Sequence, residues 1–132
     1  MEVKTNNKKK FINCLMSIFI AFVFMFGLAG CGTGDIGINQ FDVTDTNMSV
    51  EYNNYSKEYY VTITGKAKNK TSIKFSYVDI EFSLYDAEGN SIGVCDDFIS
   101  VLGGGETWSF EATSFGVSKQ PVSFKLSAIT CW

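Results

Sequence analysis

Apolar and polar residues alternate with a period of two along most of the chain after residue 35, the pattern of strands that bury one face. Tyr59, Val61 and Ile63 share one parity of such a run, and Thr62 and Thr64 share the other. Similar runs recur roughly every ten residues, between clusters of turn-forming Asn, Gly, Ser and Asp. The pattern predicts an all-β domain over 36–132: an antiparallel immunoglobulin-like β-sandwich of about seven strands.

Local breaks in the alternation predict where strands bend and end. Residues 73–84 form the longest run, and its parity changes near Val78, which predicts a bulge or a sharp twist there. Residues 86–90 (DAEGN) predict a hairpin loop with a glycine available for positive φ. The stretches 36–43 and 48–52 are each expected to form a strand.

The first 30 residues have a different character. Three lysines at 8–10 precede an almost wholly apolar stretch over 11–27. A basic start, an apolar stretch and small residues at the cut are typical of a secretory signal peptide. The ending Leu28-Ala29-Gly30-Cys31 resembles the bacterial lipobox, which implies cleavage between Gly30 and Cys31 and lipidation of Cys31. The alternative is an uncleaved transmembrane anchor, because the residues from Phe11 to Gly30 could span a bilayer.

This interpretation divides the chain into a lipoprotein signal peptide over 1–30, a lipidated cysteine with a short tether over 31–35, and one domain over 36–132. Two or three acyl chains on Cys31 would hold a small domain firmly at a membrane surface. We therefore expect a protein anchored by lipid to the extracytoplasmic face of the cell membrane. The use of lysine as the only basic residue, with many asparagines, favours a Gram-positive bacterium.

Composition excludes several classes of function. The 132 residues contain no histidine and no arginine, so all 11 basic residues are lysines. Without histidine there is no imidazole metal site and no histidine-dependent catalytic triad. Four lysines and one acid belong to the first 30 residues, so the rest holds seven lysines, 13 acids and a charge of −6. An acidic domain without arginine is a poor nucleic-acid binder, and no nucleic-acid partner is expected.

A set of spaced motifs resembles the FxLYD domain. In order, these are V-T-I-T-G ending at Gly65, Asn69, F-S-L-Y-D over 82–86, Gly105-Glu106, and W-S-F over 108–110. The resemblance extends from about Tyr59 to Phe110 and implies an immunoglobulin-like β-sandwich found in small surface proteins, commonly lipoproteins. It implies no catalytic residues. Phe82 and Leu84 have core-facing parity, and Asp86 is placed to cap backbone amides in the following turn.

Two thiols remain after lipidation of Cys31, those of Cys95 and Cys131. Two cysteines in one small exported domain can pair in oxidising surroundings. Each is out of phase with the main apolar set of its strand, so both are expected on the outer face, where a disulfide could join them. Unpaired thiols are the alternative. Two cysteines without histidine do not favour a zinc site.

The aromatic stretch of Tyr52, Tyr55, Tyr59 and Tyr60 is the strongest candidate for a binding surface. Tyrosine rings can stack on sugars or form a protein contact. The alternative is that these rings cover the edge of the sandwich.

Clusters of charged residues are weaker candidates for a binding site. The acidic pairs Asp42/Asp45 and Asp96/Asp97 offer oxygen ligands, but neither completes a calcium loop, so no metal is expected. Lysines at 66, 68, 70 and 74 could face an anionic lipid or wall polymer, or could protect a sheet edge from aggregation.

These observations predict a non-catalytic binding or interaction module at the cell surface, without a cofactor. Its expected contacts are the membrane, through the lipid on Cys31, and an envelope protein or wall polymer. The alternative function is that of a structural or wall-polymer-binding envelope factor.

Overall fold

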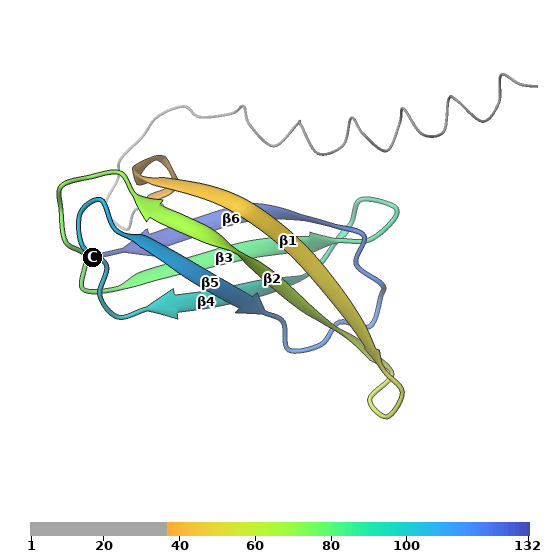
Figure 1. Cartoon of the computed structure of the whole chain (residues 1–132). Helices are drawn as coiled ribbons and strands as arrows, with labels where there is room; N and C mark the ends of the chain where they lie inside the picture. Colours follow the sequence, from red (N-terminus) through yellow and green to blue (C-terminus); the bar gives the residue numbers. More distant parts are fainter. Residues whose placement is uncertain (1–36) are drawn as a thin grey trace, which may run out of the picture.

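The computed structural model describes residues 37–132, an all-β fold of six antiparallel strands preceded by one short 3-10 helix (Figure 1). In chain order the elements are η1 (Gly37–Gln40), β1 (Phe41–Asn53), β2 (Glu58–Asn69), β3 (Val78–Tyr85), β4 (Ser91–Ile99), β5 (Thr107–Thr113) and β6 (Ser123–Cys131). The predicted signal peptide, the cleavage between Gly30 and Cys31, the lipidation of Cys31 and the tether lie outside the described residues. Within 37–132, no helix has the length and apolar character needed to cross a membrane.

The six strands form one curled sheet with the order β1-β2-β5-β4-β3-β6. Pairing is extensive within β1-β2-β5 and within β4-β3-β6, but β4 and β5 meet at one register pair, Asp96 opposite Thr113. The sheet curls at this narrow junction, so the inner faces of both halves contribute to one core (Figure 1). The rings of Phe82 on β3 and Phe110 on β5, one from each half, lie 5.5 Å apart.

Alternating burial explains why these segments are strands. Along β3, residues at 78, 80, 82 and 84 are buried and those between them are half-buried, and along β5 buried residues alternate with exposed ones. The all-β prediction is confirmed. The core contains these buried apolar residues: Phe41, Val61, Ile63, Ala67, Phe75, Val78, Ile80, Phe82, Leu84, Cys95, Leu102, Trp108, Phe110, Ala112, Val117 and Ile129.

The strands differ from the sequence-based prediction at two places, one that changes their number and one that changes where a strand begins. The stretches 36–43 and 48–52 do not form separate strands, because residues 37–40 form η1 and residues 41–43 and 48–52 belong to the single strand β1, which has a register shift between Thr44 and Asn47. Asp45 accommodates this bulge with φ of 55°. Residues 73–77 precede β3, so the parity change near Val78 marks a strand boundary.

A second bulge lies in β6 at Ser127, whose hydroxyl donates a hydrogen bond to the backbone oxygen of Glu81 at 3.0 Å. The sequence pattern predicts Ala128 on the same face as Leu126, and this prediction is wrong. The extra residue reverses the parity, so Ile129 is fully buried instead.

Gly65 allows β2 and β5 to pack closely. It stands opposite Phe110, and a Cβ at this position would lie 2.5 Å from Cζ of that ring and 3.1 Å from the Thr44 backbone oxygen. The glycine of the V-T-I-T-G motif therefore leaves space for a core aromatic ring.

Candidate functional site

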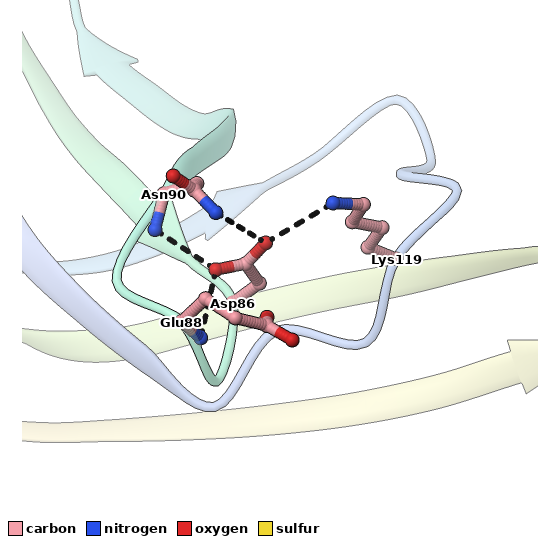
Figure 2. Close-up of polar contacts among 4 residues, drawn as sticks. All are labelled: Asp86, Glu88, Asn90 and Lys119. Atoms are coloured by element: carbon pink, nitrogen blue, oxygen red, sulfur yellow. Dashed lines mark hydrogen bonds and ion pairs between the residues drawn. The ribbon is translucent and has the colours of Figure 1, made fainter.

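The hairpin between β3 and β4 is built around the buried Asp86, the last residue of the F-S-L-Y-D motif (Figure 2). Its Oδ1 accepts hydrogen bonds from the backbone N–H groups of Glu88 at 3.1 Å and Asn90 at 2.8 Å. Its Oδ2 accepts from the side-chain amide of Asn90 at 3.3 Å and pairs with Lys119 Nζ at 3.4 Å. The predicted capping role of Asp86 thus matches the geometry, and the carboxylate also ties the hairpin to the loop before β6.

These contacts favour the charged form of Asp86. The backbone hydrogen bond from Asn90 lowers its pKa below 3.8, and the side chains of Asn90 and Lys119 act in the same direction. Because the folded-state pKa is lowered, the stabilisation is present above the ordinary carboxyl pKa and is lost as the pH falls through the folded-state value.

We expect Asp86→Asn to lower the melting temperature at neutral pH, because the variant loses the ion pair with Lys119 and weakens the capping of the turn. The difference from wild type should begin to shrink as the pH falls below about 4, the ordinary carboxyl pKa, and should be smallest below the lowered folded-state pKa, where the wild-type carboxylate is itself protonated. Melting curves across this pH range provide the measurement. Glu88→Gln is the matched control, since Glu88 enters the network through its backbone N–H. Equal melting temperatures of Asp86→Asn and Glu88→Gln at neutral pH would contradict the assigned role.

A second motif residue, Asn69, is fully buried at the end of β2. Its side-chain amide donates to the backbone oxygens of Ile73 at 2.7 Å and Gly103 at 3.0 Å. Its Oδ1 accepts from the backbone N–H and the hydroxyl of Thr71, at 3.0 and 2.8 Å. Asn69 therefore joins the loop after β2 to the turn before β5. In that turn, Glu106 Oε2 accepts from the Gly103 N–H at 2.6 Å.

Three of the motif residues thus direct polar side chains toward turns and loops of the fold. The side-chain polar groups of Asp86, Asn69 and Glu106 each bond to a turn or loop. Phe82, Leu84 and the two aromatic residues of W-S-F belong to the core. The arrangement fixes turns and packing.

The two thiols occupy different positions from those expected. Cys95 is fully buried, and its Sγ lies 3.7 Å from the Val61 backbone oxygen, so the prediction of an outer-face position is wrong. Burial, with a smaller effect from Asp96, raises the pKa of Cys95 to about 11. Cys131 turns inward after the bulge at Ser127, and its Sγ lies 3.6 Å from Gln40 Oε1.

The strand register keeps Cys95 and Cys131 apart. They flank β3 on opposite sides, at the levels of Phe82 and Val78. Two strand spacings and a four-residue offset separate their Cα atoms by about 16 Å, far beyond the roughly 7 Å limit for a disulfide. The predicted bridge between Cys95 and Cys131 is therefore wrong for this fold.

We expect the intact mass of the chain, after exposure to an oxidant under native conditions, to show no two-hydrogen loss from a Cys95–Cys131 bridge. Cys95 should also resist alkylation until the protein unfolds, because its thiol is buried and its pKa is raised. Mass spectrometry of peptides before and after denaturation measures both. A peptide pair linked through Cys95 and Cys131 would contradict the register.

The structure places the four predicted tyrosines at the tip of the β1–β2 hairpin, but on different sides. Tyr55 in the turn is almost completely exposed. Tyr52 and Tyr59 face each other across the hairpin with ring centroids 4.8 Å apart, and Tyr59 packs against the core. Tyr60 points to the opposite face. A shallow depression at the tip is lined by Glu51, Tyr52, Asn53, Asn54, Tyr55 and Tyr60.

A second exposed aromatic surface lies on the outer face of β4-β3-β6, and the sequence analysis missed it. Three aromatic rings, hereafter the aromatic row, lie side by side there: Phe98 in β4, Tyr77 just before β3 and Trp132 just after β6. Ring centroids of Tyr77 and Trp132 are 4.3 Å apart and those of Tyr77 and Phe98 are 5.7 Å apart, both stacked with 20° between planes. Phe98 is 59% exposed and Trp132 is 65% exposed. No local pattern unites three residues so distant in sequence.

Carboxylates border the aromatic row on the same outer face. Asp79 stands opposite Phe98, and Glu81 stands opposite Asp96 in the next outward-facing pair. Partial burial raises the pKa of Asp79, and the neighbouring charges of Asp96 and Glu81 raise it further. Desolvation and the nearby Asp79 also raise the pKa of Tyr77. The aromatic row therefore lies in a locally negative field.

Three of the four acids considered for calcium take part in ion pairs or hydrogen bonds, and the fourth, Asp96, lies beside the aromatic row. Asp45 pairs with Lys66 at 3.1 Å and Asp42 with Lys70 at 3.3 Å. Asp97 Oδ2 accepts from the Glu111 backbone N–H at 2.8 Å, which links β4 to β5 beside their narrow junction. Residues 37–132 contain no group of three or more metal-ligating side chains that could hold an ion.

Comparison with known proteins gives no match for this chain among family models, curated proteins or solved structures.

Proposed function

We propose that this protein is a membrane-anchored extracytoplasmic lipoprotein whose domain acts as a non-catalytic binding module at the cell surface. The N-terminal pattern supports the proposed extracytoplasmic localisation, because a basic start, an apolar stretch and L-A-G-C occur in the order that lipoprotein processing requires. The partner in this proposal is another envelope protein.

One observation carries the binding role. The polar groups of the motif residues are used to hold the fold, whereas the aromatic row lies open to solvent on the outer face. Stacked aromatic residues supply a large contact area with little loss of conformational freedom, which is why they are enriched at binding surfaces. A surface of this kind suits recognition and contains no catalytic constellation.

The fold proposed for this module is an immunoglobulin-like β-sandwich of the FxLYD type. The curled sheet supports it, because the two halves meet at one register pair and share a core. The structural roles of Gly65, Asn69 and Asp86 also support it, since each motif residue has a specific packing or capping partner.

Lipidation can be tested by treating cells with globomycin, which blocks lipoprotein signal peptidase. A larger precursor should accumulate, and Cys31→Ser should abolish both the lipid and the cut. A chain of unchanged size in treated cells would contradict the lipoprotein assignment.

Partner binding can be tested by placing a photo-crosslinking amino acid at single sites in the full chain. Val94 lies on the outer face beside the carboxylates and is 44% exposed. Phe115, in the loop after β5 and almost fully exposed, is the matched control. We expect one stoichiometric protein adduct from Val94 and none from Phe115. The absence of a specific adduct from Val94 would overturn the module proposal.

The exposed tip of the β1–β2 hairpin favours one alternative, binding of a wall glycan. Tyr55 projects beside the side-chain amides of Asn53 and Asn54, a combination that could stack on and hydrogen-bond to a sugar. Replacing Tyr55 and Tyr60 by Ala should then abolish sedimentation of the protein with purified wall polymer while the melting temperature stays near wild type. Unchanged sedimentation would rule against this alternative.

A further inference from the structure

We propose that the outer face of β4-β3-β6 docks a lysine- or arginine-bearing segment of a protein partner, with its cationic side chain lying along the aromatic row and facing Asp79 and Asp96. This inference rests on the proposed binding function and specifies the chemistry of the partner.

The aromatic row offers a long aliphatic stem a continuous apolar surface, at whose ends lie the outer ring faces of Phe98 and Trp132. Tyr77 stacks on Trp132 on one side and on Phe98 on the other, so the rings cover neighbouring strands as a continuous surface. A lysine or arginine stem can lie along such a surface, and its charged end is attracted to the outer ring faces of Phe98 and Trp132, which are largely exposed.

The charge next to the rings selects a cation. Asp79, Glu81 and Asp96 face outward together, and the raised pKa of Asp79 reflects partial burial and these like charges. Within residues 37–132 the ion pairs use Asp42, Asp45 and Asp86, and none involves the three acids beside the row. Their charge is available to an incoming ammonium or guanidinium group.

The same charges argue against other occupants. Three clustered carboxylates repel an anionic lipid surface or an anionic wall polymer. A neutral glycan would use the rings but would gain little from this local excess of negative charge. The outer face therefore fits a basic protein segment best.

Trp132 provides a direct readout of binding. It is 65% exposed within the row, whereas Trp108, the other tryptophan, is a core residue. We would titrate the full chain in nonionic detergent with a short glycine-lysine peptide and follow tryptophan fluorescence. The matched probe is the same peptide with acetylated lysines, which keeps the stem and removes the charge. Loss of the fluorescence change in the Trp132→Phe variant would assign that change to Trp132.

We expect saturable binding of the lysine peptide, with a Kd on the order of a millimolar, and no binding of the acetylated peptide. Asp79→Asn combined with Asp96→Asn should weaken binding by roughly tenfold. Glu51→Gln combined with Glu58→Gln makes the same change of net charge on the β1–β2 hairpin and should have little effect. Added salt should weaken binding of the lysine peptide.

Three results would overturn the inference: equal binding of the acetylated peptide, equal weakening by the two double variants, or no saturable signal. Saturation by wall polymer in place of the lysine peptide, or self-association of the chain through this face, would also overturn it. If the lysine peptide fails to bind while Val94 still crosslinks one protein, the cation inference is wrong and the module proposal stands. If Val94 yields no adduct, the proposed function itself fails.

Discussion

Replacing Asn69 by Ala should destabilise the fold by roughly 2–4 kcal/mol, because the backbone oxygens of Ile73 and Gly103 would lose a buried donor. Asn69→Asp should be comparably harmful at neutral pH, since a carboxylate in that place would face two carbonyl oxygens. Burial and this repulsion should raise the pKa of the new carboxyl above its ordinary value. Stability should therefore recover partly as the pH falls and the carboxyl becomes protonated.

Urea unfolding at neutral and acidic pH measures both effects. Asn54→Asp is the matched control, because Asn54 is exposed in the β1–β2 turn and the substitution is the same. If Asn69→Asp unfolds at the same urea concentration as Asn54→Asp, the side chain of Asn69 is not the link between the two loops.

Phe82→Ala should lower the free energy of unfolding by about 3–5 kcal/mol, the range for removing a large buried aromatic side chain. Phe82 is 1% exposed, and its ring centroid lies 5.5 Å from that of Phe110 and 5.8 Å from that of Phe124. It thus connects the β4-β3-β6 half of the sheet to β5 in the other half, and a cavity there would weaken both.

Phe115→Ala removes the same side chain from a position that is 95% exposed, and it should change the stability by no more than about 0.5 kcal/mol. Denaturant unfolding of the two variants gives the comparison. A small effect of Phe82→Ala would contradict the conclusion that the F-S-L-Y-D motif specifies the core.

The sequence predicts strands and core residues best where buried and less buried positions alternate strictly. β3 and β5 follow the pattern of period two with one buried face, so their strands and core residues could be predicted. The hairpin over 86–90 was also predictable, because Asp86 and Gly89 have the turn chemistry that it needs, and Gly89 adopts φ of 83°.

The sequence-based predictions of side-chain position fail at bulges and where distant segments pair. The extra residue at Ser127 reverses the faces of β6, so the positions of Ile129 and Cys131 could not be inferred by counting alternate residues. The aromatic row depends on the register of three strands, because Tyr77 meets Trp132 only when the end of β6 pairs with the residues before β3. Register of this kind is a tertiary property.

The central claim is that the motif residues hold the fold while the aromatic row binds the partner. The most direct measurement is the yield of the Val94 photo-crosslink in cells for Trp132→Ala, recorded with the melting temperature of the same variant. We predict loss of the adduct with a melting temperature close to wild type, because the Trp132 ring is largely exposed and its backbone still pairs with Tyr77. An undiminished adduct, with the variant folded, would contradict the claim.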